Sequence, residues 1–383
     1  MMINSKSERY DDRFMMYFLS GISGFGSVSI LKLSEYYDDL KEILLFDPDE
    51  PDEANLLTKS QILNLCNSIP EIDNKYAEYE KLLNSDINYI TYSDDNYPSR
   101  LRNIPDPPAV LFVMGDLPSP DMPTVSIVGS RAATNYGISV SEYFGEVLAD
   151  QGIGIISGMA LGIDSAAHRG ALNSYSGKTY AVLGGGVNIV YPRENVYIYD
   201  KIIESNRGGI ISEMIPGTNA VSKNFPMRNR IISGLSDIVL IVEAREKSGS
   251  LITADIALEQ GKDIMAVPGR ITDPMSKGCN MLINAGARMV NSPEDVMDQL
   301  NLGLRKNISL PDKKYNILAK NEKIVYSTLD SSPKHLDEIV YKTGLPIAEV
   351  ISILVELEIK GFATQISSNY YGLAPDIPDA FKF

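Results

Sequence analysis

The sequence predicts an α/β protein built around a doubly wound parallel sheet, and three observations support this. Short apolar runs alternate with helical stretches through the middle of the chain, as in sheets covered by helices on both faces. Glycine-rich turns follow most of these runs. The chain has 383 residues, 44% of them hydrophobic, which is enough for two or three domains and a large core.

The first 75 residues predict a small helical domain. Glycines at 21, 24 and 26 lie between apolar runs, a pattern typical of two short helices joined by a tight turn. Such a helix–hairpin–helix-like or SAM-like domain could touch a phosphate backbone through glycine N–H groups. The acidic stretch 47–53 favours packing or protein contact instead, because carboxylates repel phosphate.

Residues 76–302 carry the parallel-sheet pattern and predict an extended Rossmann-like domain. Helices are expected over 135–151 and from Asp164 onward, among others. Apolar runs bounded by turn residues are typical of buried strands. The expected strands are 109–114, 124–128, 154–157, 179–183, 209–213, 237–242, 263–267 and 287–290.

Residues 303–318 are polar and predict a linker, and residues 319–383 predict a winged helix. The third helix of this domain would read the major groove if the domain bound a duplex. It carries three glutamates and no cation before Lys360, so we expect a packing or protein-contact role. The expected helices and hairpin are 322–329, 335–342, 347–359 and 362–373.

The net charge of −15 is unevenly distributed. Residues 1–124 carry −12, residues 125–290 carry zero and residues 291–383 carry −3. Charges act mainly within a Debye length of about 8–10 Å. The acidic balance of the whole chain therefore does not exclude nucleic-acid binding by the middle segment.

The remaining composition predicts a cytoplasmic protein without a metal site. Cys66 and Cys279 are far apart, which argues for a reducing compartment. Two cysteines and two histidines, at 168 and 335, are too scattered for a standard zinc site. No apolar run is long enough for a membrane span, and the polar N-terminus does not resemble a signal peptide.

Glycine-rich turns are expected at the carboxyl ends of five strands, where ligands of doubly wound sheets bind. Backbone N–H groups of such turns can approach phosphate oxygens. Neither a P-loop nor a complete GxGxxG motif is present, so we expect no nucleotide cofactor. In the first turn, Gly129 and Ser130 precede Arg131, a cation suited to a phosphate of a longer polymer. The alternative for Arg131 is a solvated loop tip.

The stretch from Lys223 to Arg230 packs three cations, two amides and one aromatic ring into eight residues without an acid. A polyanion held by Lys223, Arg228 and Arg230 while a base stacks on Phe225 would explain this composition. The alternative is a helix start at Pro226 with solvated arginines. The two interpretations are compatible if the helix start directs these side chains at the ligand.

Three acids and one histidine near strand ends invite a catalytic interpretation. Asp164 and His168 lie one helical turn apart and could act as a general base. We favour a capping aspartate and a packing histidine, because no nucleophile motif is nearby. Glu213 and Glu243 could contact a ribose hydroxyl or orient Arg228 or Arg230.

The glycine-rich turns belong to a series of motifs along the middle of the chain. The motifs are Ile127–Arg131, Ser157–His168, Leu183–Gly186 with Tyr191-Pro192, Phe225–Arg230, Glu243-Ala244, Ser248–Ala254, Val267–Gly269 and Gly278–Ile283 with Gly286-Ala287. In this order they resemble the DprA/Smf family of DNA-processing proteins. The resemblance spans about 97–290, and the helical and winged-helix segments also match the family's three-part layout.

The resemblance implies a homodimer that binds single-stranded DNA and loads the RecA recombinase during natural transformation, without being an enzyme. Arg131 and Lys223 would hold phosphates, Phe225 would stack on a base, and Arg228, Asn229 and Arg230 would line the groove. The turns of Gly129-Ser130 and Gly249-Ser250 would donate N–H groups. Met281, Leu282 and Ile283 are candidates for the dimer contact.

The main alternative is a nucleotide-processing Rossmann enzyme resembling the phosphoribohydrolases. Those enzymes carry a Pro-Gly-Gly-x-Gly-Thr turn with a catalytic glutamate nearby. The nearest turn here is Gly184-Gly-Gly-Val-Asn188, which lacks that threonine and that glutamate.

Overall fold

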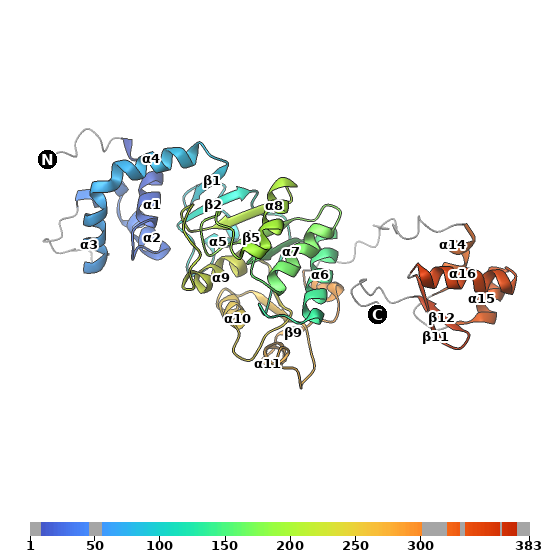
Figure 1. Ribbon diagram of the computed structural model, residues 1–383. Coiled ribbons are helices and arrows are strands. Elements are labelled where there is room, and N and C mark those ends of the chain that lie inside the picture. The colour runs from blue at the N-terminus through green and yellow to red at the C-terminus, as the bar shows by residue number, and fades with distance from the viewer. Residues whose placement is uncertain (1–8, 46–55, 301–319, 330–333, 361, 374–383) are drawn as a thin grey trace. The chain divides into compact units, whose positions relative to one another are not determined.

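The computed structural model (Figure 1) describes residues 9–45, 56–300, 320–329, 334–360 and 362–373. The chain forms two compact units, Met1–Leu302 and Gly303–Phe383, and each is described by itself. The linker expected at 303–318 lies outside the described residues. The finer division expected at residue 75 stays a prediction, and this position falls within a helix that spans Ile72–Leu83.

The first unit contains a nine-stranded sheet in the order β1-β2-β6-β5-β4-β3-β7-β8-β9. The strands from β3 to β9 run parallel, whereas β1 pairs antiparallel with β2 and β2 pairs antiparallel with β6. The strands are β1 (Ile87–Thr91), β2 (Val110–Gly115), β3 (Thr124–Val128), β4 (Gly154–Ser157), β5 (Thr179–Val182), β6 (Gly208–Ser212), β7 (Ile238–Ile241), β8 (Asp263–Ala266) and β9 (Arg288–Met289).

The strand order reverses at β3, whose neighbours are β4 on one side and β7 on the other. Connections leave β3 and β7 in opposite directions, so their carboxyl ends border an open crevice. Ligands of doubly wound sheets bind at such a switch point. The turn after β3 and the turn after β7 therefore lie where a ligand is expected.

Both faces of the sheet are buried, and alternate residues of each strand enter different clusters. Ile155 packs in a cluster with the helices α6, α7 and α12, whereas Ile156 packs in a cluster with α5, α9, α10 and α11. Burial on both faces explains the continuous apolar runs. Figure 1 labels all of these helices except α12. They span α5 (Ser99–Arg102), α6 (Asn135–Asp150), α7 (Ile163–Asn173), α9 (Asn224–Leu235), α10 (Gly249–Glu259), α11 (Lys277–Asn284) and α12 (Pro293–Gln299).

The α/β prediction is confirmed, and the eight expected strands lie within about two residues of their predicted ends. The strand β1 was not expected. Its sequence Ile-Asn-Tyr-Ile-Thr has the β-branched and aromatic residues typical of strands, but it is short and follows a helix directly. It pairs in register with β2, from Ile87 opposite Met114 to Thr91 opposite Val110.

The N-terminal helices share a hydrophobic cluster with one face of the sheet. α1 begins after Asp11, whose side chain accepts from the Phe14 N–H group, and it buries six consecutive residues from Phe14 to Leu19. Tyr17 meets Phe112 of β2 edge to face at 6.3 Å. The expected helix pair around the glycine turn is present. These helices are α1 (Asp12–Ser20), α2 (Ser27–Tyr36), η2 (Leu40–Leu45), α3 (Lys59–Ser68), η3 (Ile69–Glu71) and α4 (Ile72–Leu83).

The second unit has its own core and is a winged helix, as expected. A three-stranded sheet in the order β10-β12-β11 packs beside three helices. α16 exposes an aliphatic stripe at Ile347, Ile351, Val355 and Ile359. Its elements are α14 (Lys320–Tyr326), β10 (Lys334–His335), α15 (Leu336–Thr343), α16 (Ile347–Ile359), β11 (Ala363–Ser367) and β12 (Tyr370–Leu373).

Candidate nucleic-acid interface

The turn after β3 presents Arg131 at the switch point. The Ser130 N–H group donates to the Glu243 carbonyl at 2.8 Å, which ties this turn to the end of β7. A Cβ atom on Gly129 would lie 2.6 Å from Ile163 Cγ1 and 2.8 Å from the Glu243 oxygen, so only glycine fits there. Arg131 itself is exposed. The packed backbone beneath it leaves its side chain free to reach a ligand.

Gly162 supports the same turn from below. It precedes α7 with φ of 78°, and a Cβ atom there would lie 2.3 Å from the Ser130 carbonyl oxygen. The next N–H group, of Ile163, donates to that oxygen at 3.2 Å. Side chains are disfavoured at this φ, and the approach of two backbones excludes them altogether.

The start of α9 places an aromatic ring beside Arg131. The buried side chain of Asn224 donates to the Gly184 carbonyl at 3.0 Å, which fixes the helix start to the turn after β5. The Arg131 guanidinium carbon lies 4.9 Å from the centre of the Phe225 ring. Tyr191 stacks on that ring at 5.7 Å, with 26° between the ring planes.

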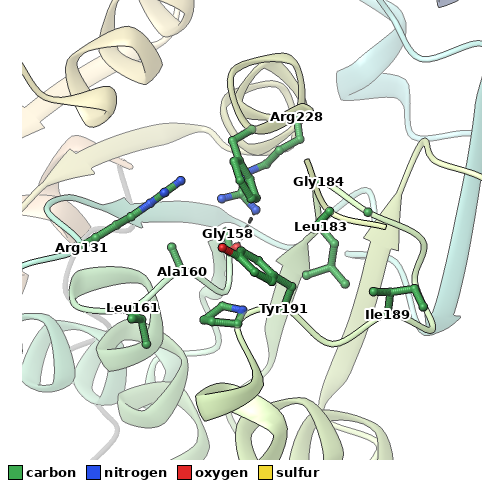
Figure 2. Close-up of a pocket in the computed structure, with 13 residues that line it drawn as sticks. Arg131, Gly158, Ala160, Leu161, Leu183, Gly184, Ile189, Tyr191 and Arg228 are labelled. Atoms are coloured by element: carbon green, nitrogen blue, oxygen red, sulfur yellow. Dashed lines mark hydrogen bonds between the residues drawn. The ribbon is translucent and has the colours of Figure 1, made fainter. Parts of the chain in front are cut away.

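Arg228 is buried beneath this pair. Its Nη1 atom donates to the Gly158 carbonyl at 2.5 Å and to the Val182 carbonyl, and Figure 2 shows the side chain pointing from α9 toward Gly158. Nη2 lies 3.9 Å from an Asp164 carboxylate oxygen. Burial lowers the pKa of Arg228 to about 10 and raises the pKa of Asp164, although each charge opposes the shift of the other. Arg228 therefore stays charged at neutral pH.

Arg230 does not join these residues. Its guanidinium donates to Glu213 at 2.6 Å and to Asp106 at 2.9 Å, away from Arg131 and Phe225. Two positions along an α-helix are about 200° apart, so Arg228 and Arg230 face nearly opposite directions. Glu213 orients Arg230, which was one of the alternatives predicted from the sequence. However, Arg230 is held in a structural ion pair, so the prediction that it lines the groove is wrong.

A pocket of about 100 Å³ opens beside the Phe225 ring, and we call it the apolar pocket (Figure 2). Tyr191 and Phe225 line it together with the turns that follow β4 and β5. No acid is among its lining residues, which are Arg131, Gly158, Ala160, Leu161, Leu183, Gly184, Gly185, Ile189, Tyr191, Pro192, Ala220, Phe225 and Arg228.

A more open hollow adjoins it across Arg131 and Phe225, and we call it the cationic groove. It runs over the ends of β3 and β7 and reaches the first turn of α10. Gly249 and Ser250, expected before that helix, form its first two residues, after Ser248 as the cap. The groove is lined by residues 128–132, Ala160, Asp164, Ser222, Phe225, Pro226, Arg228, Asn229, Ile232, Arg245, residues 247–250, Ile252 and Thr253.

The structure brings together most of the predicted site residues and adds three others. Gly129, Ser130, Arg131, Phe225, Arg228, Asn229, Gly249 and Ser250 line one or both hollows. Lys223 is exposed directly before α9. Sequence reasoning gave no role to Arg245 and Lys247, although two cations directly after β7 were a usable signal. It noted Tyr191 only as part of a motif.

The Asp164–His168 pair is not arranged for base catalysis. His168 is fully buried, and its Nδ1 atom lies 2.6 Å from Thr179 Oγ1. Thr179 donates its own proton to the Ile155 carbonyl, so His168 must donate through Nδ1. The packing role expected for His168 is confirmed. The capping role expected for Asp164 is wrong, because Gly162 holds the cap position and Asp164, in the first turn, accepts from the Ala160 N–H group instead.

Glu243 supports the site without contacting either arginine. Its carboxylate accepts from the Thr134 N–H group at 2.9 Å and from the Thr134 hydroxyl at 2.5 Å. It thereby joins the end of β7 to the start of α6. Among the described residues, Glu243 contacts neither Arg228 nor Arg230, so the alternative that it orients one of them is not supported.

The candidate dimer residues lie on α11, beside the sheet edge formed by β9. Met281 is exposed, whereas Leu282 and Ile283 are partly buried against the cluster that includes α9 and α10. Among the described residues, no helix is long and apolar enough to cross a membrane, and no cluster of acids, cysteines and histidines could hold a metal ion.

Comparisons with known proteins agree with this geometry. The model of the family described as DNA recombination-mediator protein A matches residues 88–301, and that of the DprA winged helix domain matches residues 311–368. Protein Smf of Escherichia coli is 38% identical over 284 residues, covering 72% of this chain and 75% of that protein.

Two solved structures are similar as well. The X-ray structure of DNA processing protein A from Streptococcus pneumoniae has a TM-score of 0.62 and 34% identity, covering 75% of this chain and 97% of that one. DNA processing protein A from Helicobacter pylori, whose structure is described as giving insights into a unique single-stranded DNA binding mode, has a TM-score of 0.50 and 30% identity, covering 56% and 96%.

Proposed function

The chain belongs to the DNA recombination-mediator protein A family, the DprA/Smf proteins, and on this premise we propose that it binds single-stranded DNA without sequence preference. The strand would lie along the carboxyl edge of the parallel sheet, over the apolar pocket and the cationic groove. The Helicobacter pylori relative, described in terms of single-stranded DNA binding, supports the choice of ligand.

The observation that carries the proposal is a set of unpaired cations around two stacked rings. Arg131, Lys223, Arg245 and Lys247 are exposed, and none forms an ion pair with an acid in the part of the chain that the structure describes. In a protein of net charge −15, such a group is a ready site for a polyanion.

The aromatic residues suit the bases of the strand. Phe225 and Tyr191 form a stacked pair at the mouth of the apolar pocket, and Tyr191 is 50% exposed. Stacking of a base on such a ring contributes roughly 1–3 kcal/mol and tolerates any base. The pocket thus binds bases by their faces, which explains binding without sequence preference.

The phosphates would be held by charge and by backbone groups. Arg131 stands between the two hollows and lines both. The first turn of α10 offers the Gly249 N–H group at the positive end of an eleven-residue helix, whereas the Ser250 N–H group donates to the capping Ser248 hydroxyl at 3.4 Å. Arg228 adds a buried positive charge below the strand, and Asn229 accepts from its Nε atom at 3.2 Å.

A salt titration of labelled oligo-dT tests this proposal. Phe225→Ala should weaken binding at every salt concentration without changing the salt dependence. Arg131→Ala should lower the slope of log K against log salt by about 0.7, the value for one phosphate contact on a single strand. Tyr175→Ala and Lys81→Ala, which alter exposed residues elsewhere, serve as matched controls. Unchanged binding of both site variants would show that the site is misplaced.

Two finer parts of the proposal rest on the family. We propose that the protein is a cytoplasmic homodimer in contact through Met281, Leu282 and Ile283, and that it passes the strand to the RecA recombinase during natural transformation. Light scattering of Met281→Glu tests the first part, because a buried charge at a dimer contact should give monomers. Strand exchange by purified RecA, with and without this protein, tests the second.

We also propose that the protein acts without catalysis. The apolar pocket has no carboxylate in its lining to serve as the glutamate of a phosphoribohydrolase. Incubation with nucleoside monophosphates should release no free base, as measured by chromatography. Release of base that is lost in Phe225→Ala would replace the proposed function with the enzymatic alternative.

A further inference from the structure

A third hollow continues the line of the first two, and we call it the outer groove. It lies between the start of α6 and the turn after β8. Among its exposed side chains are an aromatic ring and a cation: Tyr136, which is 49% exposed, and the guanidinium of Arg270. The full lining is Thr134, Asn135, Tyr136, Pro268, Gly269, Arg270, Asp273 and Ser276.

The outer groove shares its walls with the cationic groove. The loop after β3 lines the cationic groove with residues 128–132 and the outer groove with residues 134–136. Across the gap, Arg245 of the cationic groove donates to the sulfur of Met275 at 3.1 Å, and Met275 belongs to the loop after β8. The two grooves therefore lie side by side along the edge of the sheet.

Acids near this path are already engaged. The Glu243 carboxylate between the grooves is buried, and Thr134 donates to both of its oxygens. Asp273 accepts from the Met275 N–H group of its own loop at 2.9 Å. Arg270 has no acidic partner among the described residues, so the groove carries one unpaired cation beside one carboxylate, that of Asp273, whose Oδ1 atom is held by a backbone N–H group.

The turn that carries Arg270 is held rigidly. The Asn280 side chain bonds both backbone groups of Gly269, donating to its carbonyl at 3.0 Å and accepting from its N–H group at 3.2 Å. A Cβ atom on Gly269 would lie 2.0 Å from Ser276 Oγ. The groove is thus formed before any ligand arrives, which lowers the cost of binding.

We propose that the outer groove is an additional subsite for the same single strand, in which Tyr136 stacks on a base and Arg270 holds a phosphate. This inference rests on the proposed function. The three hollows follow the order of the strand ends: the apolar pocket at β5 and β4, the cationic groove at β3 and β7, and the outer groove at β8.

The spacing of the strands sets the length of DNA that each part can hold. Neighbouring strands lie about 4.8 Å apart, so the edge from β5 to β7 measures about 14 Å and the edge from β5 to β8 about 19 Å. At about 3.4 Å per stacked nucleotide, these lengths correspond to about four and about six nucleotides. The outer groove should therefore matter for oligonucleotides longer than about four.

The test compares oligo-dT of four and eight nucleotides by fluorescence anisotropy with the full chain. Tyr136→Ala should bind the octamer about five-fold or more weakly, the lower end of the range for loss of one stacked base, and the tetramer unchanged. Tyr136→Phe should restore octamer binding because the ring is kept. Arg270→Ala should lower the salt slope for the octamer alone.

The outcomes separate this inference from the function beneath it. The additional subsite is refuted if Tyr136→Ala and Arg270→Ala leave octamer binding unchanged, or if they weaken binding of the octamer and the tetramer equally. The proposed function still stands in that case, provided that Phe225→Ala weakens binding of both oligonucleotides. If Phe225→Ala and Arg131→Ala affect neither length, the proposed function itself fails. Tyr175→Ala and Lys81→Ala control for loss of an exposed ring and of a positive charge.

Discussion

Replacement of Arg228 by methionine should destabilise the first unit. This loss of stability would distinguish the structural role of the buried Arg228 from the ligand-binding role of the exposed Arg131. The side chain is almost fully buried, and its charged donors serve two carbonyl oxygens, of Gly158 and Val182. Methionine fills a similar space but leaves these oxygens and the Asp164 carboxylate without their cation. Removing one partner of a buried ion pair costs about 3–5 kcal/mol.

The loss of stability in Arg228→Met should depend on pH, and the environment of Asp164 determines the direction of that dependence. Burial already raises the pKa of Asp164 and Arg228 opposes that shift, so the variant should raise this pKa further. A carboxyl group with a raised pKa binds its proton more readily in the folded state, so stability increases as pH falls through that pKa. The variant should therefore lose less stability at pH 5 than at pH 8.

Urea unfolding followed by circular dichroism measures this effect, with the midpoint and slope analysed together. The double variant Arg228→Met with Asp164→Asn should regain part of the loss, because it leaves no uncompensated buried charge. Arg131→Ala should cost at most about 1 kcal/mol, since that side chain is exposed and loses only its cation–π contact with Phe225. An Arg228→Met variant as stable as the parent protein at pH 8 would refute the structural role.

Two further predictions concern residues below the site. Burial and the positive charges of Arg228 and Arg169 lower the pKa of His168 to about 3, so the unfolded chain takes up its proton from about pH 6.5 downward while the folded protein does not. The protein should lose about 1.4 kcal/mol per pH unit below 6.5 from this group, and His168→Asn should flatten that dependence in acid unfolding. If the stability of His168→Asn falls as steeply with pH as that of the parent protein, His168 is not the source of the dependence. Gly162→Ala should cost more than Gly152→Ala in thermal unfolding: both glycines have φ near 80°, but only at position 162 would a Cβ atom meet backbone. The difference should exceed about 1 kcal/mol and be accompanied by weaker DNA binding, because the Arg131 turn must shift. Equal costs would show that the two backbones can move apart.

The sequence predicted the parallel sheet well because burial on both faces leaves a strong local signal. The run Ile238–Ile241 is apolar throughout, and Val125–Val128 is interrupted only by the buried Ser126 before the turn at Gly129. The carboxyl ends of parallel strands lie at the same edge of the sheet, so the sequence alone placed Arg131 and Gly249 near each other. The same reasoning brought Phe225 to that edge.

Side-chain direction could not be predicted in the same way. Arg228 and Arg230 are two positions apart, and their opposite directions depend on where α9 begins and which face it buries. The acids Glu213 and Asp106 that pair with Arg230 come from distant segments. Tyr191 gave no local signal, because its stacking on Phe225 depends on contact between a loop and the first turn of α9, 34 positions further along the chain.

The Phe225 ring is already occupied in the free protein. It contacts the Arg131 guanidinium at 4.9 Å and the Tyr191 ring at 5.7 Å, and the Gly184 backbone lies close by. A base that stacks there exchanges one partner for another, so its net gain is smaller than that of a base meeting a bare ring. A cation–π contact at an exposed site is worth about 0.5–1 kcal/mol, which is the part forfeited. In return, the released Arg131 becomes available to the phosphate of the same nucleotide, so that stacking and charge neutralisation would occur in a single concerted exchange.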